Sequence, residues 1–302
     1  MVAAESDPRI LLTGDSGICQ ALGEMWRAHV TVDVSFARPS LLPLVWKLAR
    51  RDVLVAILMA GSPRLLARLK AFRRPIVLLW AGTDVHDCLN RDELRRQLLV
   101  LRSPVTMHAA VAPHLVEELK VLGIAAELMP LTPPDLSLVS RPAPVRHQVL
   151  FYSAPGREEF YGTGHFLSLA HEFPSVPFMA VGGGRLPGNA TSNVTDAGKV
   201  SRGHLGELYA ASTVLFRPTV HDGLPKMALE ALRYGLHVAG TVNIPGCLDG
   251  RTPAGACEAA RTILGKPPAL NAAAPNGLKE YDPSLWTKKE IARLSSLIAT
   301  SR

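Results

Sequence analysis

The chain has 302 residues, of which 47% are hydrophobic and 6% aromatic, and its formal net charge is +7. This composition is that of a globular protein with room for two domains, and it excludes a disordered chain. The four cysteines form no C-x-x-C pair, and the longest apolar run, residues 53–60, is far shorter than a bilayer span. A disulfide framework and a membrane-spanning helix are therefore not expected.

Short apolar runs alternate with helical patterns in the first half of the chain, which is typical of parallel α/β units. A helix follows the first strand, with Asp15 or Ser16 as its N-cap, and another helix at residues 113–122 lies between Pro113 and Gly123. The expected strands are residues 9–14, 30–35, 53–58, 75–80 and 105–111.

Residues 129–144 contain five prolines, which have no amide hydrogen to donate to a sheet. We interpret this segment as a final short strand and an interdomain linker. The α/β pattern then restarts. At the end of the chain, "TKKE" (287–290) predicts a capping box for an amphipathic helix containing Ile291 and Leu294. The expected strands of the second half are 148–153, 176–182, 213–218 and 237–241, and its helices lie near 163–173, 203–212, 225–234 and 254–264.

The predicted fold class is therefore α/β, with two Rossmann-like domains facing each other across a cleft. We expect an N-terminal domain at residues 1–135 and a second domain at 136–283. The C-terminal helix, residues 284–302, should pack back on the N-terminal domain, since its apolar face needs a partner.

The stretch "HDGLPKMALEALRYG" (221–235) carries the clearest chemistry. Pro225 suits the first turn of a helix that ends at Gly235, which places Asp222 in the preceding loop and Glu230 about one and a half turns into the helix. Amides at a helix start favour phosphate, and a carboxylate accepts hydrogen bonds from vicinal hydroxyls. Phosphate beside hydroxyls describes a sugar nucleotide. The alternative is that Asp222 is only a cap and Glu230 only a surface partner of Lys226.

Residues 205–241, "LGELYAASTVLFRPTVHDGLPKMALEALRYGLHVAGT", resemble the donor-binding segment of GT-B glycosyltransferases, especially the group called family 4. The E-x7-E motif of that family is D-x7-E here, Asp222 to Glu230. The resemblance implies transfer of a sugar from a nucleoside diphosphate sugar to a glycan or lipid-linked acceptor, with no cofactor besides the donor. A sugar-nucleotide epimerase and a non-catalytic binding subunit are the alternatives.

In this family the residue matching Glu230 binds the ribose, and the residue matching Asp222 reaches the transferred sugar. The positions of the family's diphosphate-binding Arg and Lys hold Ser153 and Tyr161, so Arg157 and Lys226 are candidate replacements or else solvated surface charges. The remaining donor-binding candidates are His221, Gly223, Leu224, Pro225 and Lys226 in the motif, and Gly183 in "AVGGGRLPG" (180–188), which is similar to the loop beside the base or is a plain glycine turn.

Two strand ends in the first half carry further candidates. In "LTGDSG" (12–17), Gly14 and Ser16 could present amides to the diphosphate, or form an ordinary cap. In "WAGTDVHD" (80–87), which resembles a turn of some GT-B enzymes, Asp84 could act as a base and His86 could orient a hydroxyl. A turn-stabilising Asp84 is the alternative. No spacing matches a known metal site, and no metal is expected.

Residues 38–74 contain nine Arg or Lys against one acid, Asp52. Residues 41–51 and 63–74 have the pattern of basic amphipathic helices, which suit an anionic membrane surface or are simply solvated surface helices. Nucleic acid is not an expected partner, because no binding motif is present. Without the pattern of a secretory signal at the N-terminus, we expect a cytoplasmic protein that binds peripherally to the inner face of the membrane.

Overall fold

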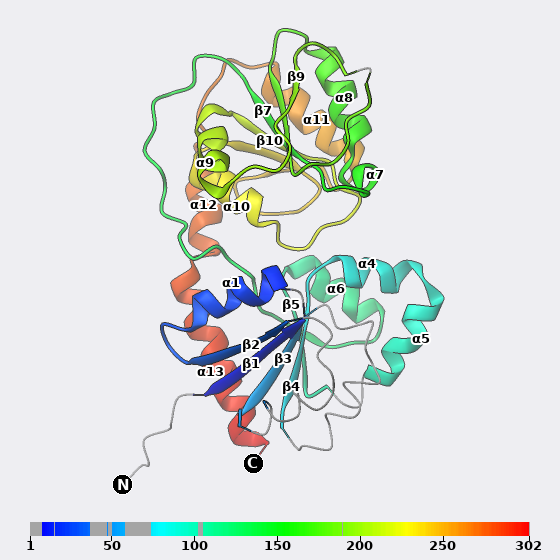
Figure 1. The fold of residues 1–302 in the computed structure, drawn as a ribbon, viewed down its shortest axis with the longest axis vertical. Coiled ribbons are helices and arrows are strands. Elements are labelled where there is room, and N and C mark those ends of the chain that lie inside the picture. The colour runs from blue at the N-terminus through cyan, green and yellow to red at the C-terminus, as the bar shows by residue number, and fades with distance from the viewer. Residues whose placement is uncertain are drawn as a thin grey trace. The chain divides into compact units, whose positions relative to one another are not determined.

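Figure 1 shows the computed structural model, which describes residues 8–14, 16–36, 47, 50–57, 74–101, 105–188 and 190–301. The chain divides into two compact units. The first is Met1–Pro134 together with Asp282–Arg302, and the second is Asp135–Tyr281. Each unit is built around one six-stranded sheet.

The sheet of the first unit is parallel at every pair of neighbouring strands. Its two central strands are apolar and fully buried, because helices cover both faces of a parallel sheet. In spatial order the strands are β2 (Thr31–Phe36), β1 (Arg9–Gly14), β3 (Val53–Ile57), β4 (Ile76–Trp80), β5 (Met107–Ala110) and β6 (Ala126–Leu128).

The described helices of the first unit come from both ends of the chain. The first helix contacts β1 and β2 and also lies beside the C-terminal helix, as Figure 1 shows. These helices are α1 (Ser16–Trp26), α4 (Thr83–Asn90), α5 (Asp92–Leu101), α6 (Pro113–Val121) and α13 (Pro283–Thr300).

The second unit repeats this plan with its own parallel sheet. In spatial order its strands are β12 (Leu248–Asp249), β11 (His237–Gly240), β10 (Val214–Arg217), β7 (Val149–Tyr152), β8 (Phe178–Val181) and β9 (Val194–Asp196). Its helices are α7 (Glu158–Tyr161), α8 (Thr163–Glu172), α9 (Arg202–Ala211), α10 (Lys226–Arg233), α11 (Pro253–Leu264) and α12 (Ala274–Glu280).

The core of the second unit lies where α8 and α11 cover the sheet. Phe151 of β7 and Phe166 of α8 stack with ring centroids 4.4 Å apart. Phe216 of β10 is fully buried in the same cluster. This apolar layer holds the central strands rigidly, so the loops at their ends start from fixed positions.

The predicted α/β class with two parallel sheets is confirmed, and the C-terminal helix belongs to the first unit as expected. The prediction of a strand within residues 129–144 is wrong. The strand in this region, β6, ends at Leu128, and only Met129 continues its pairing by donating to the carbonyl of Ala110 at 2.8 Å. The prolines that follow cannot donate to a ladder.

The capping box predicted at 287–290 is also wrong, because α13 begins four residues earlier. Asp282 is its N-cap and accepts a hydrogen bond from the amide of Ser284 at 2.8 Å. Thr287 and Glu290 are instead inside the helix and buried, with 3% of each exposed. Glu290 accepts a hydrogen bond of 2.8 Å from the indole of Trp26 in α1.

Candidate functional site

The strand ends of the second sheet bring separate loops together. Because all its strand pairs are parallel, the carboxyl ends of β7, β8, β10 and β11 lie along one edge. The loop after β10 leads into α10 and contains Asp222, while Arg157 and Gly183 follow β7 and β8. This edge is where ligands of open α/β sheets bind.

Arg217 ends β10 and is the buried cation of this edge, with 9% of the residue exposed. Its Nη2 donates to Oδ2 of Asp222, and Oδ1 of Asp222 accepts from the amide of Gly223 at 3.0 Å. Burial opposes the charge of Arg217, but Asp222 and the hydroxyls of Tyr161 and Tyr209 raise its pKa above the ordinary value. Both oxygens of Asp222 are therefore engaged, one by the end of β10 and one by the next residue of the loop.

The start of α10 lies directly beyond this ion pair. Pro225 is the N-cap residue, and its carbonyl accepts the first helical hydrogen bond, from Ala228, at 2.9 Å. Earlier amides of the helix have no partner in the helical ladder and make its start an anion-attracting end. Gly223, Leu224 and Pro225 are buried, whereas His221 and Lys226 are half-buried.

A small cavity of about 10 Å³ opens beside the start of α10, which is room for about one water molecule. Its polar lining comes from Arg217, Thr219 and Asp222. The hydroxyl of Thr219 lies 3.0 Å from that of Thr241, which follows β11. The rest of the lining is Pro225, Ala228, Val238, Gly240, Val242, Ile244 and Cys247.

Glu230 has a buried partner. The hydroxyl of Tyr209, in α9, donates to its Oε2 at 3.1 Å, and Tyr209 is 2% exposed. Burial, followed by the charge and the hydrogen bond of Glu230, raises the pKa of Tyr209 well above its usual value of 10. The tyrosine is therefore a permanent donor that orients this carboxylate. Within the described residues, Oε1 of Glu230 accepts no hydrogen bond.

The loops after β7 and β8 are joined through Glu158. Its Oε1 accepts hydrogen bonds from the amides of Gly156 at 3.1 Å and Arg185 at 2.9 Å, and these contacts lower the pKa of Glu158. The two loops border an open cavity of about 620 Å³. Gly183 lines it with a φ of 80°. Arg157 is exposed, and its guanidinium carbon lies 4.2 Å from the ring centroid of Phe160.

The candidates of the first unit lie at the ends of two strands. Gly14 has a φ of 126°, and a Cβ there would lie 1.9 Å from the carbonyl oxygen of Ile57, so only glycine fits. Ser16 begins α1. Asp84 is 8% exposed and accepts from the amides of Ala81, Gly82 and Val85 at 2.9–3.1 Å. Burial raises the pKa of Asp84 to about 6, although these amides act in the opposite direction.

His86 lies two residues after Asp84 in α4, and its Nδ1 is 3.2 Å from the side-chain amide of Asn90. Burial and the charges of Asp84 and Asp87 raise the pKa of the nearby Cys88 thiol to about 11. In the part of the chain that the structure describes, no group of three or more His, Cys, Asp or Glu side chains is placed to hold a metal ion.

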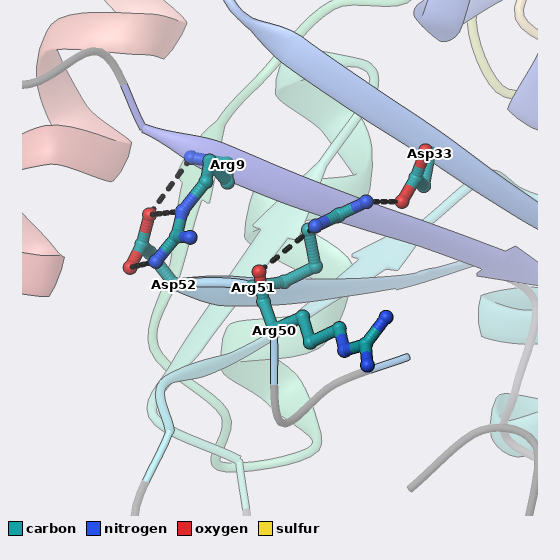
Figure 2. A network of polar contacts seen from close by, with 5 residues as sticks. All are labelled: Arg9, Asp33, Arg50, Arg51 and Asp52. Atoms are coloured by element: carbon teal, nitrogen blue, oxygen red, sulfur yellow. Dashed lines mark hydrogen bonds and ion pairs between the residues drawn. The ribbon is translucent and has the colours of Figure 1, made fainter. Parts of the chain in front are cut away.

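Most of the basic stretch 38–74 lies outside the described residues, including both of its predicted helices apart from Lys47, Arg50, Arg51 and Arg74. Figure 2 shows that Arg51 forms an ion pair with Asp33 of β2 and also donates to the carbonyl of Arg50. Asp52 accepts two hydrogen bonds of 3.1 Å from the guanidinium of Arg9 in the same view. Arg51 is therefore partly neutralised within the fold.

No protein-family model and no curated protein matches this sequence. Solved structures do match. HepE from Anabaena, in complex with UDP-glucose, is 15% identical with a TM-score of 0.71, covering 96% of this chain and 100% of its own. Sucrose-phosphate synthase from Thermosynechococcus elongatus is 14% identical with a TM-score of 0.73, covering 97% and 100%. The chain has the GT-B fold.

The pneumococcal O-GlcNAc transferase GtfA, in complex with UDP and GlcNAc, is a more distant GT-B neighbour. It is 11% identical, with a TM-score of 0.54, and the match covers 82% of this chain and 57% of that one. A shared fold does not by itself define a reaction, which depends on the residues of the site.

Within this GT-B fold, the structure groups one set of candidates and separates another. The motif residues from His221 to Glu230 lie on one loop and helix, with Arg157 and Gly183 on neighbouring strand ends of the same unit. Gly14, Ser16, Asp84 and His86 belong to the other unit. Sequence reasoning missed Arg217 and Tyr209. An arginine in the apolar strand "VLFR" was the one available signal for Arg217.

Proposed function

We propose that this chain is a glycosyltransferase that moves a sugar from a nucleoside diphosphate sugar to a glycan or lipid-linked acceptor. The observation that carries the proposal is Glu230, whose carboxylate is oriented by Tyr209 through one oxygen while the other accepts nothing within the described residues. A carboxylate held in this way can accept hydrogen bonds from the ribose hydroxyls. The adjacent start of α10 suits the diphosphate.

We assign the donor roles as the resemblance of residues 205–241 to GT-B donor-binding segments implies. Glu230 binds the ribose, Asp222 reaches the transferred sugar, and the amides after Gly223 hold that sugar. As the nucleoside diphosphate leaves, its growing charge is stabilised by the start of α10. The structures of HepE contain UDP-glucose, or UDP and glucose, and GtfA contains UDP and GlcNAc, which supports a nucleotide-sugar donor here. No cofactor besides the donor is proposed.

We assign the acceptor to the first unit. Asp84, whose pKa burial raises to about 6, is suited to take a proton from an acceptor hydroxyl near neutral pH. His86 would orient that hydroxyl. If the acceptor is lipid-linked, residues 38–74 would hold the protein at the inner membrane face, where that acceptor lies. Among the residues described, no helix combines the length and the apolarity needed to cross a membrane.

The test is a thermal-shift screen of UDP-, GDP- and ADP-sugars, followed by mass spectrometry of the nucleotide and sugar products. We expect one nucleotide to stabilise the protein and its sugar to be released slowly to water or transferred to an acceptor. The Glu230→Gln variant should lose most of the stabilisation. A new sugar nucleotide without any acceptor would indicate an epimerase, and binding without turnover would indicate a binding subunit. No response to any nucleotide would refute the proposal.

A further inference from the structure

Arg217 occupies the middle of the carboxyl edge of the second sheet. It is the last residue of β10, which lies between β7 and β11, and it pairs in register with Gly240. Only 9% of Arg217 is exposed. A buried cation is costly unless its donors are satisfied, so the surroundings of its guanidinium indicate what it is meant to bind.

The guanidinium is only partly satisfied. One donor, Nη2, is used by Asp222, whereas Nε is buried and has no hydrogen-bond partner within the described part of the chain. Arginine carries five N–H donors in a planar fork, and it can bind a carboxylate and a second anion together. The Asp222 carboxylate alone therefore leaves donor capacity unused in a buried position.

The surroundings of this donor favour an anion. Arg217 lines the small cavity together with Thr219 and with Pro225 and Ala228 at the start of α10. The eight residues of α10 place the positive end of its dipole at this point. A phosphate is larger than the cavity, so it would approach from the solvent side, where 21% of the Asp222 side chain is exposed.

Exposed Arg157 and the two positions that hold cations in the family are placed differently. Arg157 is exposed, with its guanidinium over the ring of Phe160. Ser153 carries no charge, and its hydroxyl lies 3.3 Å from that of Thr163. The Tyr161 hydroxyl, in contrast, interacts electrostatically with Arg217, which places this guanidinium near the loop after β7 as well as the loop after β10.

We propose that Arg217 binds the diphosphate of the donor, and that Asp222 orients its guanidinium and competes with the phosphate for it. This inference rests on the proposed function. It assigns to a residue of β10 the cation that neutralises the leaving nucleoside diphosphate. The planar fork would contact the phosphate oxygens while remaining on Asp222, which links the diphosphate to the residue proposed to reach the sugar.

The test uses inorganic pyrophosphate, together with UDP, GDP and ADP and their monophosphates, measured by titration calorimetry on the full chain. In Arg217→Gln, affinity for pyrophosphate and for the bound nucleoside diphosphate should fall about tenfold to hundredfold. Affinity for the monophosphate should fall less. Arg217→Lys keeps the positive charge but lacks the planar fork of donors, so its affinities should lie between those of wild type and the Gln variant.

Two further variants separate ligand binding from loop support. Asp222→Asn should retain or increase affinity for pyrophosphate, because the competing carboxylate charge is removed. Arg233→Gln is the matched control, since Arg233 also forms an ion pair in this unit, with Asp135, but at the far end of α10. It should leave pyrophosphate affinity unchanged. If Arg217→Gln does not fold, the Lys and Asn variants carry the test.

Each result has a definite meaning. Wild-type affinities in Arg217→Lys and Arg217→Gln would overturn the inference while leaving the proposed function intact. Equal losses in the Arg217 and Asp222 variants would also overturn it, because the pair would then only support the loop. If the wild-type chain bound neither pyrophosphate nor any nucleoside diphosphate, both the inference and the proposed function would fail.

Discussion

The hydroxyl of Tyr209 donates a hydrogen bond of 3.1 Å to Oε2 of Glu230, although 21 residues separate them in the sequence. Tyr209 is fixed by burial and by stacking on Tyr234, with ring centroids 5.4 Å apart. The bond therefore ties α10 to α9 and restricts the orientation of the Glu230 carboxylate. An exposed helix residue would have no such restraint.

Replacing Glu230 with Gln should weaken nucleoside diphosphate binding by about tenfold, because a charged acceptor for the ribose hydroxyls becomes a neutral amide. The unfolding free energy should change by less than about 1 kcal/mol, since Gln keeps an oxygen for Tyr209. Calorimetry with UDP, GDP and ADP measures the first effect and thermal denaturation the second. Equal affinities in wild type and variant would remove Glu230 from the ribose site.

Tyr209→Phe keeps the ring and removes only the hydroxyl that orients Glu230. We expect affinity for the ribonucleotide to fall by a few fold, about 0.5–1 kcal/mol. The preference for the ribonucleotide over the 2′-deoxynucleotide should become smaller. Tyr234→Phe is the control, because the Tyr234 hydroxyl makes no hydrogen bond in the described part of the chain. If Tyr209→Phe prefers the ribonucleotide over the 2′-deoxynucleotide as strongly as wild type does, the tyrosine only supports packing.

Asp222→Asn should lower turnover by about 100-fold while nucleoside diphosphate binding is maintained, because its proposed partner is the transferred sugar. Asn still has an oxygen that can accept from Arg217, so the loop should keep its shape. Steady-state donor hydrolysis and calorimetry on the same preparation separate the two effects. A collapse of nucleotide binding would mean that Asp222 only holds the loop.

Glu290 predicts a pH dependence of stability. Burial raises its pKa from 4.5 to about 8, although the hydrogen bond from Trp26 acts in the opposite direction. The folded state therefore keeps this proton at pH values where the unfolded chain has lost it. The associated stability is complete below about pH 4.5 and is lost as the pH rises to about 8.

Glu290→Gln should remove this dependence, since an amide does not titrate. The unfolding free energy of the variant relative to wild type should rise by about 3 kcal/mol between pH 5 and pH 8. Glu127→Gln is the control, because Glu127 of β6 forms an exposed ion pair with Arg293 of α13, the helix that contains Glu290. Chemical denaturation across this pH range measures the unfolding free energies of both variants. If wild type and Glu290→Gln depend on pH in the same way, Glu290 is not the source of the pH dependence.

The basic stretch predicts salt-sensitive binding to anionic vesicles. Replacing Arg50, Arg73 and Arg74 with Gln should remove about 1 kcal/mol of attraction each and abolish sedimentation with vesicles at low salt. Arg51 should contribute less, because it is already paired with Asp33. Donor hydrolysis in solution should survive in the variant. Wild-type protein that ignores anionic vesicles at low salt would assign the stretch to an ordinary solvated surface.

The sequence by itself determined the α/β class, most strand and helix positions, and the placement of Asp222 and Glu230 on one loop and helix. These features depend on local rules: apolar periodicity, the position of Pro225 at a helix start, and the helix stop at Gly235. The N-cap of α13 was assigned to the wrong residue. "TKKE" fits a capping box, but Asp282 caps the helix and Pro283 is its first residue, a start signal that is also local.

Only the tertiary structure decided which side chains meet. The Tyr209–Glu230 bond depends on α9 lying beside α10, and the Trp26–Glu290 bond joins residues 264 positions apart. Arg217 and Asp222 are close in sequence, yet their pairing requires the chain to turn back over the end of β10. Sheet order and burial fix such contacts, and neither has a local signature in a single sequence, because each is set by many distant residues together.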